Sequence, residues 1–212
     1  MWILRINTSN LSYELEEVPE KYKLLYGRAL TSQMVYDEVP PLCHPLGPNN
    51  KLIFSAGMVT GTVSPTSARI SVGGKSPLTG GIKEANAGTA WGPDLAKLRI
   101  RALVLEGQPL DTKTYAGALI KWDGEKPVVE FFDATEYTGK DVYDIYPSLF
   151  ERWGPKVSIA SMGVVSEMGY SNSGIVFNDM HNRPSRYAGR GGLGAVLASK
   201  RMKFVILDAI GA

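Results

Sequence analysis

The sequence predicts an α+β fold with many short strands, a few short helices and an internal pseudo-duplication. Short apolar segments with strand-like alternation recur along the chain, whereas stripes at helical spacing are few. Two glycine-rich segments, residues 64–90 and 186–195, stand in opposite halves of the chain, and each contains arginine. Because no long linker separates the halves, we expect residues 1–212 to form a single domain.

The first half is expected to combine a strand hairpin, two helices and further strands. Pro19 can begin a helix, because its fixed φ suits the first helical turn, and an apolar stripe continues to Leu30. A loop rich in proline, glycine and asparagine follows from Pro40 to Asn50, and a second helix is expected over residues 90–98. The predicted strands are residues 2–6, 13–17, 52–55, 68–73 and 102–106.

The second half repeats this mixture. Asp123-Gly124 is a strong signal for a hairpin turn between two strands. Residues 142–153 form one apolar helical stripe, and Pro147 within it is expected to kink or shorten the helix. The predicted strands are residues 115–121, 128–132, 157–160, 175–177 and 204–207.

Composition argues against several classes of protein. The formal net charge of +2 is too small to predict binding to nucleic acid or to an anionic membrane, and no apolar run is long enough to span a bilayer. The N-terminus has no basic leader or cleavage pattern, so we expect a cytoplasmic protein. Cys43 is the one cysteine, which excludes an internal disulfide and an iron–sulfur site built from this chain's thiolates alone.

Residues 186–195 carry the strongest functional signal. Arg186 and Arg190 offer planar forks that match phosphate oxygens, and the helix-like segment that follows would direct free N–H groups forward. Glycines let a backbone approach a ligand closely, and four stand here: Gly189, Gly191, Gly192 and Gly194. The pattern favours an anion cradle for a phosphorylated cofactor. The alternative is a glycine-rich turn that caps a helix, with solvated arginines.

A similar pattern stands upstream. Arg69 leads a predicted strand, and residues 86–88 are expected to form a short polar loop that opens onto the helix at 90–98. Asn86 could instead simply cap that helix. Two such loops in opposite halves predict a duplicated architecture with two phosphate-binding edges.

Other candidate residues have plainer interpretations beside their functional ones. Trp91 could lie against a flat heterocycle, but core packing is favoured. Glu84 could act as a general base, although a solvated or salt-bridged carboxylate is favoured. Cys43, His44 and His181 lie in predicted loops, and neither histidine has a partner at metal-ligand spacing.

Several separate motifs together resemble the N-terminal domain of the aldehyde ferredoxin oxidoreductases, which are tungsten or molybdenum enzymes that oxidise aldehydes to carboxylic acids. The resemblance covers nearly the whole chain in matching order. The motifs are Leu52-Ile-Phe-Ser-Ala-Gly-Met-Val-Thr-Gly61, Ala68-Arg69, Lys75-Ser-Pro-Leu-Thr-Gly80, Ala85-Asn-Ala-Gly88, Leu103-Val-Leu-Glu-Gly107 and Ala188-Gly-Arg-Gly-Gly-Leu-Gly-Ala-Val196.

The resemblance implies two mixed β-sheets that support a tungsten- or molybdenum-bis-pterin cofactor. It assigns Arg69 and Arg186 to the pterin phosphates, and the backbone carbonyls of Asn86 and Tyr187 to a magnesium ion that bridges them. Tyr187 stands where the family usually has alanine, and the segment from His181 to Arg186 is longer than usual. The full implied cofactor-binding set is Arg69, Asn86, Ala87, Gly88, Arg186, Tyr187, Ala188, Gly189, Arg190 and Gly191.

The resemblance also implies an activity and partners. An aldehyde and water would give a carboxylic acid, with electrons passing to ferredoxin. The 4Fe-4S cluster and the acid/base residues would lie in later domains or in a cysteine-bearing partner subunit, so the chain alone is expected to be inactive. A homodimer is left open. The alternative is a stand-alone module that binds pterin or another phosphate ligand without redox activity.

Overall fold

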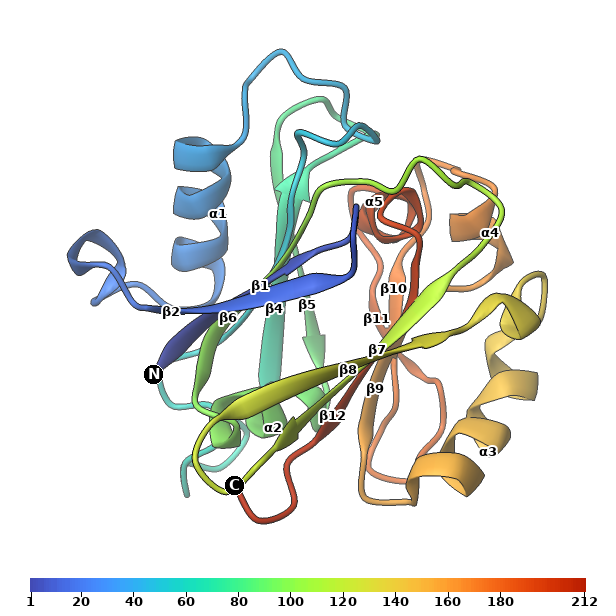
Figure 1. Cartoon of the computed structure of the whole chain (residues 1–212). Helices are drawn as coiled ribbons and strands as arrows, with labels where there is room; N and C mark the ends of the chain where they lie inside the picture. The colour runs from blue at the N-terminus through green and yellow to red at the C-terminus, as the bar shows by residue number, and fades with distance from the viewer.

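The computed structural model describes all 212 residues and contains two six-stranded mixed sheets side by side (Figure 1). The first sheet has the strand order β2-β1-β6-β3-β4-β5, and the second has the order β11-β10-β9-β12-β7-β8. In Figure 1 the first lies towards the left, in blue to green, and the second towards the right, in yellow to red. The predicted α+β class with two mixed sheets is confirmed.

The strands and helices have the following bounds. The first sheet consists of β1 (Trp2–Asn7), β2 (Ser12–Glu17), β3 (Leu52–Ala56), β4 (Arg69–Lys75), β5 (Ile82–Gly88) and β6 (Ile100–Glu106). The second consists of β7 (Ala116–Trp122), β8 (Pro127–Asp133), β9 (Ser158–Ser161), β10 (Ile175–Phe177), β11 (Arg186–Ala188) and β12 (Met202–Asp208). The α-helices are α1 (Gly27–Glu38), α2 (Trp91–Lys97), α3 (Val142–Trp153), α4 (Val164–Glu167) and α5 (Leu193–Ser199).

The two sheets repeat one another strand for strand. Each begins with an antiparallel hairpin, β1–β2 or β7–β8, whose first strand pairs in parallel with the last strand of its own half, β6 or β12. Every other neighbouring pair is antiparallel. The helices follow the same plan, because α2 directly precedes β6 as α5 directly precedes β12. The pseudo-duplication predicted from two similar loops therefore extends to the whole fold.

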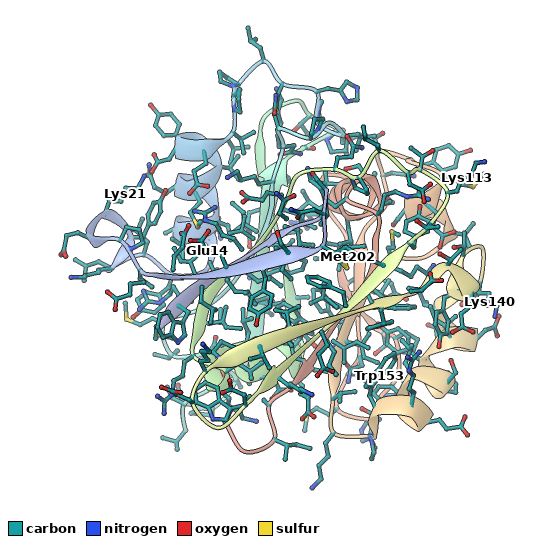
Figure 2. All side chains as sticks on the ribbon, viewed as in Figure 1. Glu14, Lys21, Lys113, Lys140, Trp153 and Met202 are labelled. Carbon is teal, nitrogen blue, oxygen red and sulfur yellow. The ribbon has the colours of Figure 1, made fainter.

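Apolar side chains fill the space between the sheets. Trp91 of α2 is fully buried there and packs against Phe54 of β3 and Phe177 of β10. A separate apolar cluster lies between α1 and the outer face of the first sheet, while α3 covers the second sheet. Figure 2 shows this contrast, with Met202 inside the molecule and Lys21, Lys113 and Lys140 at its periphery.

The first predicted helix is wrong in its position. Residues 20–22 form only a single 3-10 turn, and α1 begins at Gly27 and continues to Glu38. The apolar stripe that was expected to end at Leu30 continues through Met34 and Val35, which are buried against the sheet. Burial of this later stripe decides where the helix lies, because short helices owe most of their stability to packing.

The later helix boundaries agree better with the prediction. α2 lies within the predicted residues 90–98, and α3 covers residues 142–153 without ending at Pro147. Asp141 caps α3, since its side chain accepts a hydrogen bond from the N–H of Tyr143. None of the helices combines the length and the apolar character needed to cross a membrane.

Candidate functional site

One edge of each sheet lies against the other sheet, between the two halves of the molecule. β5 is the last strand of the first sheet and β11 the last strand of the second, and the two lie next to each other (Figure 1). An edge strand leaves part of its backbone N–H and C=O groups without a partner in its own sheet. All the residues of the predicted cofactor-binding set lie on these strands, at the start of β4, or in the loop that follows β11.

One cleft of about 470 Å³ brings the two halves of the predicted site together. Arg69 and Gly88 line it from the first half, where they are paired across β4 and β5. Arg186 lines it from the second half, together with Asp179 and Met180. The structure thus places Arg69 and Arg186 in one cleft, although they are separated by more than half of the sequence.

The arginines at this edge lack acidic partners. Arg69 donates from Nη1 to Oδ1 of Asn86 at 2.9 Å, and Asn86 donates in turn to Oγ of Ser71 at 3.0 Å. Arg186 and Arg190 are exposed, and none of the three arginines forms an ion pair. The cleft therefore carries uncompensated positive charge that suits an anionic ligand.

Asp179, which the sequence interpretation missed, organises the loop that leads to Arg186. The buried carboxylate accepts from Nε and Nη2 of Arg183 at 3.0 and 2.8 Å, and from Oγ of Ser185 at 2.9 Å. It also accepts from the backbone N–H groups of His181 and Arg183. Burial alone would raise the pKa of Asp179, but these hydrogen bonds hold it well below its usual range.

Residues 86–88 do not form the predicted polar loop. They belong to β5, where Asn86 pairs with Ser71 of β4, so Asn86 does not cap α2. The N-cap residue of α2 is Ala90, and just before it Oγ1 of Thr89 accepts from the N–H of Trp91 at 3.2 Å and donates to the carbonyl of Asn178 at 2.9 Å. The pairing of β5 with β4 overrides the weak strand propensity of these small and polar residues.

Two of the glycines after β11 allow the chain to pack closely against neighbouring backbone. The N–H of Gly194 in the first turn of α5 donates to the carbonyl of Ser173, so this donor is used within the protein. A side chain at Gly192 or Gly194 would collide with backbone carbonyls, at 2.2 and 2.4 Å. The carbonyl of Gly191 accepts from Oγ of Ser76, which ties the β4–β5 turn of the first half to this loop. The anion-facing start of α5 stays a prediction, whereas Arg186 lies at the cleft.

The other candidate residues from the sequence make contacts within the protein. Trp91 packs in the core, and its Nε1 donates to the carbonyl of Val205, so the packing interpretation is right. Glu84 lies 3.7 Å from Nε of Arg28, as expected for a salt-bridged carboxylate. Tyr187 is about half exposed and donates from its hydroxyl to the carbonyl of Pro184. No group of three or more His, Cys, Asp or Glu side chains is placed to hold a metal ion.

Comparisons with known proteins agree over nearly the whole chain. A sequence model of the family described as "Aldehyde ferredoxin oxidoreductase, N-terminal domain" matches residues 3–209. The chain is 36% identical over 216 residues to the tungsten-containing aldehyde ferredoxin oxidoreductases of Pyrococcus furiosus and of Thermococcus kodakarensis. Each alignment covers 97% of this chain but only 32% of the relative.

A solved structure extends the likeness to the fold. The active-site complex BamBC of benzoyl coenzyme A reductase, bound to 1,5-dienoyl-CoA, contains a chain that superimposes on this one with a TM-score of 0.86 at 25% identity. The match covers 97% of this chain and 30% of that one. In both comparisons, similarity is confined to about a third of a longer protein.

Proposed function

The chain belongs to the aldehyde ferredoxin oxidoreductase family through its N-terminal domain, and we propose that residues 1–212 form one domain that binds a tungsten- or molybdenum-bis-pterin cofactor along the β5–β11 edge. The observation that carries the proposal is the convergence of Arg69 and Arg186, from the two halves of a duplicated fold, on one cleft without an acidic partner.

The residues present suit the phosphate groups of such a cofactor. Arg69 and Arg186 would each contact a phosphate, because a guanidinium fork matches phosphate oxygens. The acidic side chains in the cleft do not compete for these arginines, since Asp94 is paired with Lys97 and Asp179 with Arg183. The backbone carbonyls of Asn86 and Tyr187, on the two edge strands, would hold a magnesium ion that neutralises part of the phosphate charge.

The remaining contribution of this chain is to bind and to orient. When bound, a metal bis-pterin supplies two-electron oxygen-transfer chemistry, here proposed to convert an aldehyde and water to a carboxylic acid with ferredoxin as acceptor. Asn86 holds the Arg69 guanidinium in place through the 2.9 Å hydrogen bond, and Asp179 ties down Ser185, the residue before Arg186. The 4Fe-4S cluster and the acid/base groups are assigned to further domains or to a cysteine-bearing partner subunit.

The test is the cofactor content of arginine variants. Each phosphate contact should contribute roughly 1.5–3 kcal/mol, because hydrogen bonds to charged groups are stronger than neutral ones. Arg69→Ala and Arg186→Ala should each lower the metal and pterin content per folded protein, the lysine variants should lose less, and the double alanine variant should nearly empty the site. The protein is purified without refolding, together with any chain that co-purifies.

Lys113→Ala provides the control, because it removes one exposed positive charge outside the cleft. Its cofactor content should equal that of the unmodified protein. Unchanged content in both single variants and in the pair, with normal thermal unfolding, would show that the arginines are merely solvated. Retained pterin without any bound metal would instead favour a binding module without redox function.

A further inference from the structure

The duplicated fold places a buried cation at the same point in both halves. The parallel pairing of β1 with β6 skips Arg101, and the parallel pairing of β7 with β12 skips Lys203, so both residues occupy matching irregularities of the ladder. Arg101 is 8% exposed and Lys203 is fully buried. A buried cation is costly unless an anion or several hydrogen bonds compensate it.

The second half supplies the anion from its own chain. Nζ of Lys203 forms an ion pair with Oε1 of Glu167, the last residue of α4, and the Glu167 side chain is itself only 8% exposed. The other oxygen of this carboxylate accepts from the N–H of Gly139. The charge of Lys203 is therefore matched inside the protein.

The first half has a glycine where that carboxylate would be. Ser55 of β3 pairs with Ala102, as Ser161 of β9 pairs with Phe204, and these partners directly follow the two buried cations. Gly61 lies six residues after Ser55, and Glu167 lies six residues after Ser161, so Gly61 is the equivalent of Glu167 in the first half. The turns also agree, because the N–H of Thr60 donates to the carbonyl of Gly57 just as the N–H of Ser166 donates to that of Gly163.

Arg101 consequently keeps one edge of its guanidinium unsatisfied. Nη1 donates to the carbonyls of Lys23 and Leu25 at 3.1 and 3.2 Å, and the group stacks 3.7 Å from the ring centroid of Tyr26. The buried Nε has no partner, and Nη2 reaches only the thioether sulfur of Met1 at 3.4 Å. Arg183 uses the same Nε–Nη2 edge to bind the Asp179 carboxylate.

Arg101 also lines a cavity. It has a volume of about 240 Å³, and its other walls are Lys97 of α2, the 57–62 loop that contains Gly61, and apolar side chains. Lys97 is already paired with Asp94. Met1 also lines it, and this side chain is about half exposed. A thioether is a weak hydrogen-bond acceptor on a flexible side chain, so an anion can displace it from Nη2.

We propose that this cavity binds a short-chain monocarboxylate, whose carboxylate takes in the first half the place that Glu167 takes in the second. With Met1 displaced, one carboxylate oxygen accepts from Nη2 of Arg101 and the other from Nε, which is covered in the free protein, while the short hydrocarbon tail packs against Ala56, Met58 and Ile100. Lysine cannot reproduce this contact, because it offers a point charge in place of a planar fork.

The proposal is tested by titrating the 212-residue chain with sodium butyrate at constant ionic strength, using calorimetry and the Nε–H signals of ¹⁵N-labelled arginine. We expect saturable binding of one butyrate and a shift of a single arginine Nε–H signal. Arg101→Lys should weaken binding roughly tenfold or more, the expected effect of losing one charge-assisted hydrogen bond. Absence of saturable binding, or binding that is unchanged in Arg101→Lys, would overturn the proposal.

A second pair of variants tests the site even if Arg101→Lys does not fold. Met58→Glu places a carboxylate on the wall of the cavity, so it should raise the thermal midpoint and abolish butyrate binding. Val63→Glu adds the same charge at a fully exposed residue outside the cavity lining and should change neither quantity. Equal effects of the two variants would contradict the site. Inorganic phosphate that binds as tightly as butyrate, with the same dependence on Arg101, would overturn the assignment to a carboxylate.

Discussion

Asp179 shows how one residue can control a site that it does not itself form. Asp179→Asn removes the charge that draws the Arg183 guanidinium and Ser185 hydroxyl together ahead of Arg186. Because charge-assisted hydrogen bonds are lost from a buried group, we expect unfolding in urea to require roughly 1–3 kcal/mol less free energy. Cofactor content should also fall, although Asp179 contributes no positive charge to the cleft.

The pH dependence of this effect follows from the lowered pKa of Asp179. Its stabilisation is fully present above the ordinary aspartate pKa of about 3.9 and is lost as the pH falls towards the folded-state value. The difference between the wild type and Asp179→Asn should therefore shrink in acid. Glu125→Gln, at an exposed position of the β7–β8 turn whose side chain forms no ion pair or hydrogen bond, is the control and should show the stability of the wild type. A difference that stays constant down to pH 2 would contradict this account.

Lys200 also makes stability rise with pH, but in the alkaline range. Its side chain is buried, and Nζ donates to the carbonyls of Gly47, Pro48 and Gly107. Burial lowers the pKa of Lys200 to about 8. The unfolded state then binds more protons between that pH and about 10.4, so this group makes stability rise with pH across the window, by up to about 1.4 kcal/mol per pH unit.

Comparison of the wild type with Lys200→Met isolates this contribution. The variant should be less stable at pH 7, because three carbonyls lose their donor. Its deficit relative to the wild type should grow between pH 8 and 10 in urea unfolding. A deficit that shrinks over this range would mean that the ammonium is favoured by its surroundings, in conflict with the lowered pKa.

The glycines of the α5 loop can be separated by what they touch. Gly194→Ala would place a Cβ 2.4 Å from the carbonyl oxygen of Gly174, and a backbone atom in a packed core cannot easily move away. We expect a loss of about 1–3 kcal/mol, as in other overpacked cores. Gly189→Ala is the matched control, because its new Cβ would meet nothing closer than 3.8 Å. Equal stability of the two variants in denaturant would contradict the packing role.

At the scale of elements, sequence patterns predicted strands better than loops. Alternating apolar residues located β1 and β2, and the Asp123-Gly124 turn located β7 and β8, because both hairpins are local in sequence. Residues 82–88 escaped notice because Glu84, Asn86 and Gly88 have low strand propensity, and only the distant β4 makes them a strand. Arg69 and Arg186 could be singled out from local glycine patterns, whereas the role of Asp179 depends on a loop closure that no local pattern encodes.

At the scale of the whole molecule, the duplication explains why the buried cations Arg101 and Lys203 occupy equivalent positions in the two sheets. Two similar loops indicated a repeat, but the strand-for-strand correspondence depends on pairings between residues far apart in the chain. The halves then diverged at single positions, as Gly61 and Glu167 illustrate. At the edge where β5 meets β11, the first half contributes Arg69 from β4, whereas the second half contributes Arg186 from β11.

The last prediction is that the 212-residue chain is catalytically silent alone, even when it holds cofactor. Its single cysteine cannot supply the four thiolates of a 4Fe-4S cluster, and the acidic residues of its cleft, Asp94 and Asp179, are ion-paired with cations rather than free to exchange protons. The pure loaded chain should show no aldehyde-dependent reduction of a viologen dye, with the assembled enzyme as the positive control. Addition of a cysteine-bearing partner should restore reduction, since it returns the electron path and the acid/base groups together. Sustained dye reduction by the isolated chain would show that these groups are already present in residues 1–212.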